Sequence, residues 1–219
     1  MIDLIVDPKY GYRKLAIVPE EEELIKFYKY EYHESKKHVL DTEARRKNSV
    51  TTVADDEWRK QTSFFEAKCI FERFLGDKEK SLLDIGCGNG DFLLYLQNEA
   101  WLVEGVDPSV SASSKARDQG LLVFTGTIEE FAQNRNTRYS CINMNNVLEH
   151  LKDPIGILGL CKKMLTPGGL IRIKVPNDFN MLQLIANKKV QRKNWWVSIP
   201  DHINYFTYNS LTKILYDLR

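Results

Sequence analysis

Leu82-Leu83-Asp84-Ile85-Gly86-Cys87-Gly88-Asn89-Gly90-Asp91-Phe92 is the stretch that decides the fold of this chain. Its apolar start is typical of a buried strand, and the apolar residues of a helix follow its glycines. Glycines at such a junction allow positive φ angles and let the backbone approach a ligand closely. The N-terminus of the following helix favours negatively charged ligand groups. The stretch therefore predicts a strand, a ligand-binding turn and a helix.

Strands and helices alternate along the chain around this stretch. A helical pattern begins near Asp56 and is closed by Gly76, and Pro167-Gly168-Gly169 is predicted to end the last helix of the alternation. Five strands separated by helices predict an α/β fold with a parallel sheet and right-handed crossovers, whose ligands bind outside the carboxyl ends of the strands. The strands are predicted at residues 81–85, 101–106, 121–124, 139–144 and 170–175, and the helices at 92–98, 110–119, 128–133 and 155–165.

The spacing of the glycines separates this loop from two other nucleotide-binding motifs. A dinucleotide-binding loop has the pattern G-x-G-x-x-G, whereas the glycines here stand at 86, 88 and 90. A phosphate-binding P-loop is excluded because no G-K-[ST] follows. Asp84 and Asp91 flank the loop and would serve a pyrophosphate poorly. They favour a ligand that carries an ammonium and a sulfonium.

Asp107 lies at the end of the second predicted strand, 17 residues after Gly90. An acid at this place accepts hydrogen bonds from both ribose hydroxyls of a nucleotide. In the structural alternative, the glycines only tighten a turn and Asp107 caps the next helix. The loop, the spacing of the acid and the strand order together favour the nucleotide.

Three further motifs accompany the loop: Gly105-Val106-Asp107-Pro108-Ser109, Asn146-Val147-Leu148-Glu149-His150-Leu151-Lys152-Asp153-Pro154 and Leu165-Thr166-Pro167-Gly168-Gly169. With them, roughly residues 57–176 resemble the class I S-adenosylmethionine-dependent methyltransferases. The motifs are closest to those of small-molecule enzymes of the surface-polysaccharide and quinone types. The resemblance implies an α/β, Rossmann-like, doubly wound sheet, mostly parallel, with strand order 3-2-1-4-5.

The resemblance also sets expectations about the organisation of the chain. It implies an N-terminal helical and loop extension at 1–56, a cofactor-binding core at 57–176, and a substrate cover with a C-terminal helix at 177–219. A complete domain of this family has two further strands after the helix that is predicted to begin near Asn209. The chain stops at Arg219, so either the sheet has five core strands and an exposed edge, or a C-terminal portion with the last two of the usual seven strands is missing; we expect the latter.

The resemblance implies S-adenosylmethionine as the cofactor. Thr127 stands where the family often has an acid, which leaves the adenine contact at this position to the backbone. Arg59 would reach the cofactor's carboxylate, with Arg73 as the competing residue. The other residues implied to contact the methionine, ribose and adenine portions are Asp84, Gly86, Cys87, Gly88, Asp107, Pro108, Thr127, Ile128 and Asn145.

Glu149 and His150 raise the question of a metal ion and of a catalytic base. Quinone O-methyltransferases that resemble this chain have a longer E-x-x-E-H pattern, which binds a divalent cation near the acceptor. This chain has Asn146 where the first Glu would be, and a neutral amide weakens magnesium binding, so no metal is expected. His150 is a candidate general base toward an acceptor hydroxyl. Alternatively, the pair caps the helix after the fourth strand and supports the wall of the site.

The C-terminal segment provides candidate residues for the pocket that binds the methyl acceptor. Residues 195–207 resemble the cover that precedes the next helix in these enzymes. His202, Tyr205 and Trp196 are predicted to line the acceptor pocket, and His202 is a second candidate catalytic residue; otherwise it orders the cover by hydrogen bonding. Cations at 188–193 would bind phosphates of a sugar nucleotide or of RNA, or form a solvated helix face.

The composition excludes several classes of protein. The chain has 219 residues and a net charge of +1, which argues against a generic nucleic-acid binder. No apolar run approaches 18 residues, and the N-terminus lacks the pattern of a secretory signal. The four cysteines have no C-x-x-C pair, so reduced, buried cysteines in a cytoplasmic protein are expected: Cys69, Cys87, Cys141 and Cys161.

These observations predict a cytoplasmic enzyme that transfers a methyl group to a small-molecule acceptor. An oxygen of a sugar or a lipid-linked intermediate is the first expectation, because residues 11–32 resemble the lead segment of surface-polysaccharide methyltransferases. A quinone-type or RNA methyltransferase is the alternative enzyme, although the charge balance argues against RNA. A non-catalytic cofactor-binding module is the alternative of another class. No oligomeric state follows from the sequence.

Overall fold

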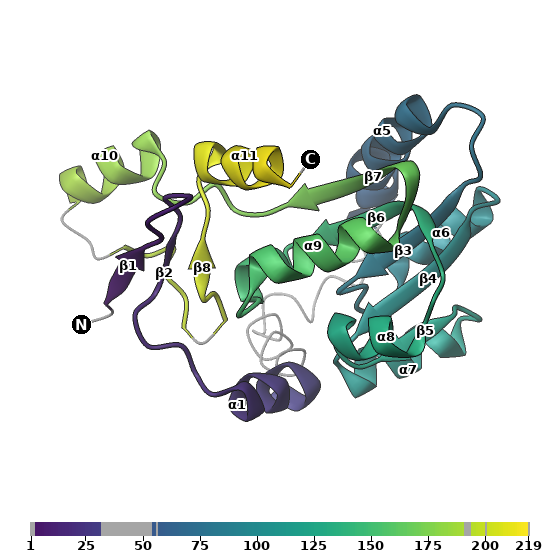
Figure 1. Ribbon diagram of the computed structural model, residues 1–219, viewed down its shortest axis with the longest axis horizontal. Coiled ribbons are helices and arrows are strands. Elements are labelled where there is room, and N and C mark those ends of the chain that lie inside the picture. Colours follow the sequence, from purple (N-terminus) through teal and green to yellow (C-terminus); the bar gives the residue numbers. More distant parts are fainter. Residues whose placement is uncertain (1–2, 32–53, 56, 191–193, 200, 219) are drawn as a thin grey trace.

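A computed structural model of the chain describes residues 3–31, 54–55, 57–190, 194–199 and 201–218. Its largest sheet has the strand order β5-β4-β3-β6-β7, and every neighbouring pair is parallel (Figure 1). Counted along the chain, this is the order 3-2-1-4-5, which confirms the predicted topology. The strands are β3 (Ser81–Ile85), β4 (Leu102–Asp107), β5 (Val123–Thr125), β6 (Tyr139–Asn145) and β7 (Leu165–Lys174).

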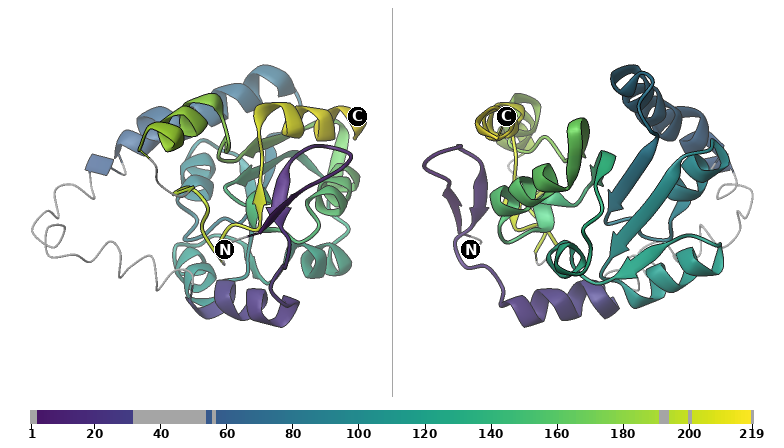
Figure 2. Two further views of the ribbon diagram at one scale, coloured as in Figure 1. Left: turned by 90° about the vertical axis from the view of Figure 1, so that its left-hand side faces the viewer. Right: turned by 45° about the vertical axis from the view of Figure 1, so that its right-hand side comes forward.

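Helices cover both faces of this sheet, and its central strand β3 is therefore buried along its whole length. Neighbouring strand residues point to opposite faces, so Leu82 and Leu83 belong to different halves of the core. Leu82 packs with α5 (Phe65–Leu75), α6 (Asp91–Asn98) and α7 (Val110–Asp118). Leu83 packs with the helices on the other face (Figure 2), which confirms the doubly wound fold. These are α8 (Ile128–Asn134), α9 (Pro154–Met164) and α11 (Tyr208–Asp217).

A second, antiparallel sheet joins the two ends of the chain. It has the order β1-β2-β8, from β1 (Leu4–Val6), β2 (Arg13–Leu15) and β8 (Asn204–Tyr205). Buried Leu15, Leu24, Ile203 and Tyr205 form its core. The sequence did not predict these strands, because two or three residues are too few to show an alternating pattern. In Figure 1 the N-terminal and C-terminal elements therefore lie together on one side of the parallel sheet.

The Pro167-Gly168-Gly169 prediction was wrong in its detail. Helix α9 already ends at Met164, and the chain enters β7 at Leu165. The pairing of β7 with β6 shifts register between Tyr139 and Cys141, and Gly168 has a φ of +68°. The glycines therefore accommodate an irregular strand start instead of ending the helix.

The remaining helical elements include two π-helical turns. The acidic segment after Pro19 forms α1 (Glu21–Lys26), which continues as the π-helical turn η1 (Phe27–Glu31). A second π-helical turn, η2 (Lys60–Phe64), leads into α5, and Gly76 ends α5 at a φ of +58°. The other elements are the 3-10 turn η3 (Leu148–His150) and α10 (Met181–Val190).

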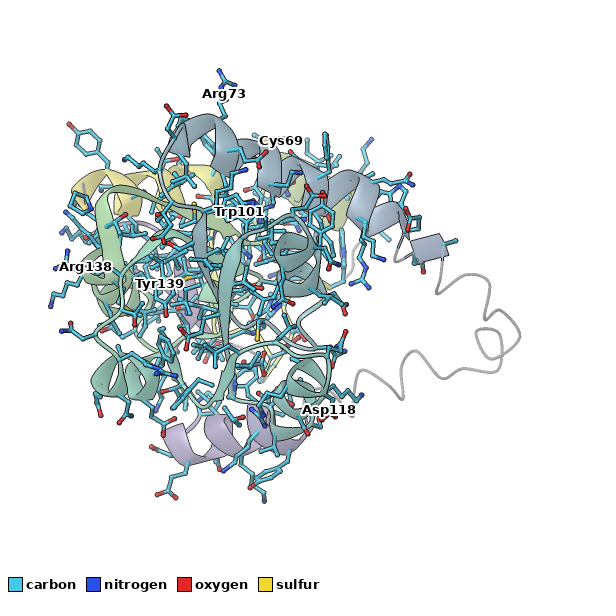
Figure 3. The ribbon with its side chains drawn as sticks, turned by 90° about the vertical axis from the view of Figure 1, so that its right-hand side faces the viewer. Cys69, Arg73, Trp101, Asp118, Arg138 and Tyr139 are labelled. Atoms are coloured by element: carbon cyan, nitrogen blue, oxygen red, sulfur yellow. The ribbon has the colours of Figure 1, made fainter. Side chains whose placement is uncertain are left out.

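Three predictions about segments and side chains have different outcomes. Among the described residues, no helix is long and apolar enough to cross a membrane. Three of the four free cysteines are buried, but Cys69 is exposed on α5, against expectation (Figure 3). For the basic residues 36–48, the lack of strong apolar periodicity in the sequence favours a loop or a loosely held helix, and this segment lies outside the described residues.

Candidate active site

Two joined cavities lie at the carboxyl ends of β3, β4 and β6. The small cavity has a volume of about 220 Å³ and reaches from the glycine loop to β7. The large cavity, of about 680 Å³, reaches from the end of β4 to η3 and α1. Gly86 and Asn145 line both cavities. The pair therefore forms one site where the predicted fold places its ligand.

The glycine loop forms one wall of the small cavity and leaves no space for side chains. Gly86, Gly88 and Gly90 have φ angles of +72°, +57° and +81°. A Cβ atom on Gly86 would lie 2.5 Å from Cγ2 of Val147, and one on Gly90 would lie 2.4 Å from Cδ1 of Leu121. Both the backbone conformation and the close packing therefore require glycine here.

Asp84 lies beneath this loop and is held by an amide. It is 5% exposed, and Nδ2 of Asn143 donates a hydrogen bond of 2.7 Å to its Oδ1. Burial raises the pKa of Asp84 to about 7. Its carboxyl group is therefore close to half ionised at neutral pH, and a cationic ligand group nearby would favour ionisation.

Asp107 connects the glycine loop to the large cavity. Its Oδ2 accepts a hydrogen bond of 2.8 Å from the backbone N–H of Gly88, and its Oδ1 accepts one of 2.8 Å from that of Ser109. Ser109, and not Asp107, is the N-cap of α7, so the predicted capping alternative for Asp107 is wrong. A carboxylate oxygen can accept more than one hydrogen bond, so these backbone contacts are compatible with a ligand at Asp107.

The predicted adenine side of the large cavity is formed by Pro108, Thr127 and Ile128. Thr127 is the N-cap of α8, where its hydroxyl accepts a hydrogen bond from Glu130 and its own N–H donates to the Glu130 carboxylate. This capping box occupies the side chain of Thr127. Ile128 is 3% exposed and packs into the core beneath the cavity.

The two basic candidates upstream of the sheet lie in different environments. Arg59 lines the small cavity and forms an ion pair of 3.4 Å with Asp91. Arg73 is exposed on α5 and points away from the molecule in Figure 3. The structure therefore brings Arg59, and not Arg73, to the predicted cofactor site.

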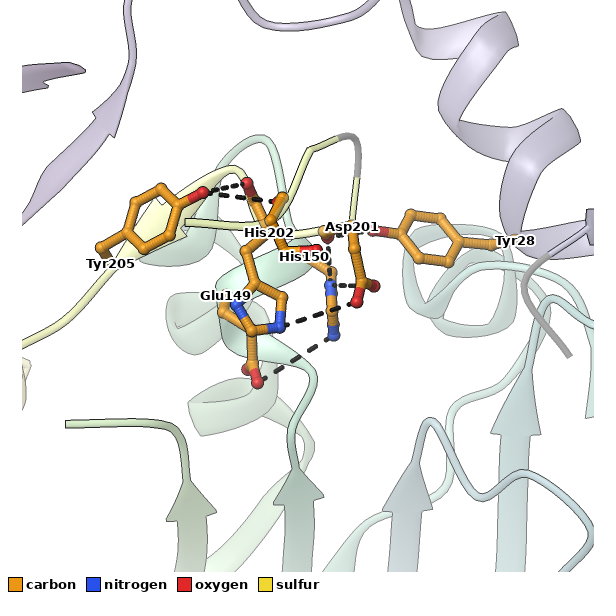
Figure 4. A network of polar contacts seen from close by, with 7 residues as sticks. Tyr28, Glu149, His150, Asp201, His202 and Tyr205 are labelled. Atoms are coloured by element: carbon orange, nitrogen blue, oxygen red, sulfur yellow. Dashed lines mark hydrogen bonds and ion pairs between the residues drawn. The ribbon is translucent and has the colours of Figure 1, made fainter. Parts of the chain in front are cut away.

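His150 lines the large cavity and is held by a residue of the C-terminal segment (Figure 4). Its Nδ1 donates a short hydrogen bond to the backbone carbonyl of Asp201, which also accepts a hydrogen bond of 2.8 Å from the hydroxyl of Tyr28. A carbonyl oxygen only accepts hydrogen bonds, so this contact places a ring proton on Nδ1. Asp153, and not His150, is the N-cap of α9, so the predicted capping role of the Glu-His pair is wrong.

Glu149 and His202 complete a cluster around His150. Glu149 is 1% exposed, with Oε1 4.0 Å from Nε2 of His150, and the rings of His150 and His202 lie 5.0 Å apart. Ligand atoms of these three residues lie within 4.8 Å of one another, a grouping that suits a metal ion. The expectation of no metal therefore stays a prediction. The ring of His202 lies beside that of His150, but His202 is not among the residues that line either cavity, so the structure does not bring it to the acceptor pocket as predicted. Its roles in catalysis and in ordering the cover stay predictions.

Trp196 and Tyr205 lie away from both cavities. Tyr205 is 1% exposed, pairs with β2, and its hydroxyl donates a hydrogen bond of 2.9 Å to the carbonyl of His202. Trp196 packs edge-on against Phe179, with ring centroids 5.3 Å apart. Neither residue is among those that line the cavities, so the structure does not bring them to the acceptor side as predicted.

Sequence reasoning missed Asn143, Arg172 and Lys174, which line the small cavity. A signal was present, because Arg172 and Lys174 alternate with isoleucines in a strand that is otherwise expected to be buried. A charged residue in such a strand needs a partner or a cavity.

Comparisons with known proteins agree with this geometry. The family model described as "Methyltransferase domain" matches residues 55–218. The ubiquinone biosynthesis O-methyltransferase of Histophilus somni (strain 2336) is 33% identical over 106 residues, covering 44% of each chain. That of Serratia proteamaculans (strain 568) is 32% identical over 123 residues, covering 53% of this chain and 51% of that protein. The chain thus spans about half the length of the curated relatives it matches.

Solved structures share the fold. A magnesium protoporphyrin IX methyltransferase from Synechocystis PCC 6803 with bound SAH has a TM-score of 0.62 and 15% identity, covering 91% of this chain and 89% of that chain. A SAM-dependent methyltransferase from Archaeoglobus fulgidus has a TM-score of 0.57 and 22% identity, covering 77% and 73%. The family match extends over more than half of the sequence, from the helix before the sheet to α11. This chain therefore belongs to the methyltransferase domain family.

Proposed function

We propose that this protein transfers the methyl group of S-adenosylmethionine to a hydroxyl group of a small molecule and leaves S-adenosylhomocysteine. One observation carries the proposal. All ten residues that the resemblance assigned to the cofactor, Arg59 included, line the two joined cavities. The proposal includes a cytoplasmic location, and the net charge of +1 supports a small-molecule acceptor over RNA.

The residues of the two cavities fit the two ends of this cofactor. Asp107 would hold the ribose with its carboxylate, and Asp84 would favour the ammonium of the methionine portion. A side chain at Gly86 would collide with Val147, so the loop presents its own backbone to the ligand at this position. When bound, S-adenosylmethionine supplies a methyl group on a positively charged sulfur, which is a good leaving group.

His150 would accept the proton of the acceptor hydroxyl. Its Nδ1 donates to the carbonyl of Asp201, so the lone pair of Nε2 is the basic site. Glu149, 4.0 Å from Nε2, would stabilise the imidazolium that proton transfer produces. The side chain of His150 is 10% exposed, which limits competition from water.

The wall of the large cavity near His150 supports a phenolic, quinone-type acceptor over a sugar. Leu24, Tyr28, Val147 and Leu151 line the large cavity, together with polar residues that include Asn146, Lys152 and Asp153. Apolar and aromatic walls suit an aromatic ring, whereas a sugar needs several polar partners. The names of the similar ubiquinone biosynthesis O-methyltransferases point the same way. The sugar and lipid-linked acceptors predicted from the sequence are the competing outcome.

Calorimetry with S-adenosylhomocysteine tests the proposal first. We expect a single site with micromolar affinity, and a folded protein that shows no binding at millimolar ligand contradicts the proposal. Methyl transfer is then measured on catechols, sugar nucleotides and RNA. Turnover on catechols supports the quinone-type acceptor, and turnover on sugar nucleotides alone supports the earlier expectation. Binding without turnover on any acceptor leaves the non-catalytic module.

A further inference from the structure

A polar row crosses three neighbouring strands beside the small cavity. The strand pairing places Asp84 of β3 beside Asn143 of β6, and Asn143 beside Arg172 of β7. Nη1 of Arg172 donates a hydrogen bond of 2.9 Å to Oδ1 of Asn143, whose Nδ2 donates to Asp84. Two residues further along both strands, Asn145 lies beside Lys174. All five of these residues line the small cavity, so the row forms one side of it.

The two cations of this row have no anionic partner within salt-bridge distance in the described part of the chain. The side chain of Arg172 makes one hydrogen bond there, to the neutral amide of Asn143, although a guanidinium carries five N–H donors. Lys174 is exposed and makes no side-chain hydrogen bond or ion pair with a described residue. Arg59, the third cation of the cavity, is already paired with Asp91.

The charge balance of the small cavity is therefore positive. Asp84 is about half ionised at neutral pH, because burial raises its pKa to about 7. It offsets part of the charge of Arg172 and Lys174, and the exposed Glu66 of α5 also acts electrostatically on Arg172 from outside the cavity lining. Under the proposed function, the methionine portion and its sulfonium occupy this cavity, and like charges repel strongly where water is scarce. An anion beside the two cations would remove this repulsion.

We propose that Arg172 and Lys174 form an anion subsite that binds a carboxylate in the small cavity. The inference rests on the proposed function and deepens it. The planar guanidinium of Arg172 matches a carboxylate through two parallel hydrogen bonds, and the ammonium of Lys174 adds a point charge. Asn143 is a positioning residue, because its amide orients Arg172 and links it to Asp84. Two sources supply this chemistry: the carboxylate of the cofactor's methionine, or an acidic group on the acceptor.

Calorimetry with two nucleosides tests the first source. S-Adenosylhomocysteine carries the methionine-derived carboxylate, whereas 5′-methylthioadenosine has the same adenosine and thioether without the amino acid portion. If the cofactor supplies the anion, the double variant Arg172→Gln/Lys174→Gln binds S-adenosylhomocysteine about tenfold or more weakly and 5′-methylthioadenosine within about twofold of wild type. A variant with Arg172→Lys in place of Arg172→Gln is expected to regain part of the lost affinity for S-adenosylhomocysteine. The control, Lys163→Gln, removes a charge from an exposed residue of α9 that does not line the cavity and leaves both affinities unchanged.

A second arm tests the acceptor as the source. Catechol and 3,4-dihydroxybenzoate are titrated into protein saturated with S-adenosylhomocysteine, and only the latter carries a carboxylate. If the acceptor supplies the anion, the double variant binds S-adenosylhomocysteine normally but loses about tenfold in affinity for 3,4-dihydroxybenzoate, with catechol unchanged. The readout is binding, so it does not depend on turnover.

The two proposals fail in distinguishable ways. Wild-type protein that binds S-adenosylhomocysteine, with a double variant that keeps all four affinities within about twofold, overturns the anion subsite and leaves the proposed function in place. Wild-type protein that binds neither nucleoside overturns both. Because Arg172 is half-buried, its replacement can impair folding; in that case Lys174→Gln, on an exposed side chain, is measured alone and must lower one carboxylate-dependent affinity.

Discussion

The small and large cavities meet at Gly86 and Asn145, yet they are built in different ways. Every residue of the small cavity comes from positions 59–174, and five of them lie on strands that the parallel sheet holds in register. The large cavity also takes Leu24 and Tyr28 from the N-terminal segment. His150 in its wall is held by the C-terminal segment, through the carbonyl of Asp201.

This difference separates the two tasks of the site. The proposed cofactor side depends on local motifs and on hydrogen bonds between neighbouring strands. The proposed acceptor side depends on three segments that the second sheet and its core bring together. Changes in the terminal segments are therefore expected to affect the acceptor more than the methionine portion of the cofactor, while the residues assigned to ribose and adenine share the large cavity with Leu24 and Tyr28. Substitutions in each cavity test whether the two sides are independent.

The largest expected effect is that of Gly86→Ala in the small cavity. Gly86 has a φ of +72°, and a Cβ atom there would lie 2.5 Å from Val147. The backbone strain and the displaced side chain are expected to weaken S-adenosylhomocysteine binding by about 1000-fold, as calorimetry measures. Gly76→Ala is the control, because Gly76 also has a positive φ but no atom within 4 Å of the added carbon. Equal affinities in the two variants would contradict the assignment of the loop.

The second effect is a dependence of stability on pH that Asp84 causes. Burial raises its pKa from 3.8 to about 7 in the folded protein, so ionisation is easier in the unfolded chain. The free energy of unfolding should therefore fall as the pH rises from about 4 to about 7, and then level off, with a total loss of about 4 kcal/mol. Urea denaturation across this range measures it.

Asp84→Asn should remove that contribution, because an amide does not ionise. Asp118→Asn on the exposed surface of α7 is the matched control and should keep the wild-type profile (Figure 3). Parallel pH profiles of the wild-type and Asp84→Asn proteins would reject the assignment.

The same contrast explains how much could be predicted from the sequence. Asp84, Gly86 and Asp107 were predicted because a strand, a turn and a helix follow one another directly in the chain. Arg172 was missed although it lies beside Asn143, because strand register is not visible in one sequence. Its polar position in an apolar strand was the available signal.

The acceptor side was less predictable because its contacts join distant residues. The hydroxyl of Tyr28 donates to Asp201, 173 positions away, and His150 bonds to the same carbonyl across 51 positions. The aromatic pattern pointed to Tyr205, which proved to be a core residue of the second sheet. The sequence alone does not distinguish an aromatic residue buried in the core from one that lines a pocket.

In the large cavity, His150→Gln should lower turnover with little effect on cofactor binding. The variant keeps a hydrogen-bonding side chain near Asp201 but cannot accept the acceptor proton. We expect kcat to fall about 100-fold, with the affinity for S-adenosylhomocysteine within about twofold of wild type. His202→Gln is measured in parallel, because its ring lies beside that of His150. A kcat within about threefold of wild type in His150→Gln would reject the base role.

The smallest effect is expected for Tyr28→Phe, which tests whether the terminal segments position the acceptor side. The substitution removes the 2.8 Å hydrogen bond to the Asp201 carbonyl and keeps the ring, which packs edge-on against His150 at 5.5 Å. One such hydrogen bond contributes about 1 kcal/mol, so KM for the acceptor should rise about fivefold. The affinity for S-adenosylhomocysteine should change little, because the lost hydrogen bond joins Tyr28 to Asp201 and involves none of the residues assigned to the cofactor. Tyr30→Phe, on an exposed side chain, is the matched control. An equal loss of cofactor and acceptor affinity in Tyr28→Phe would show that the two sides of the site are coupled.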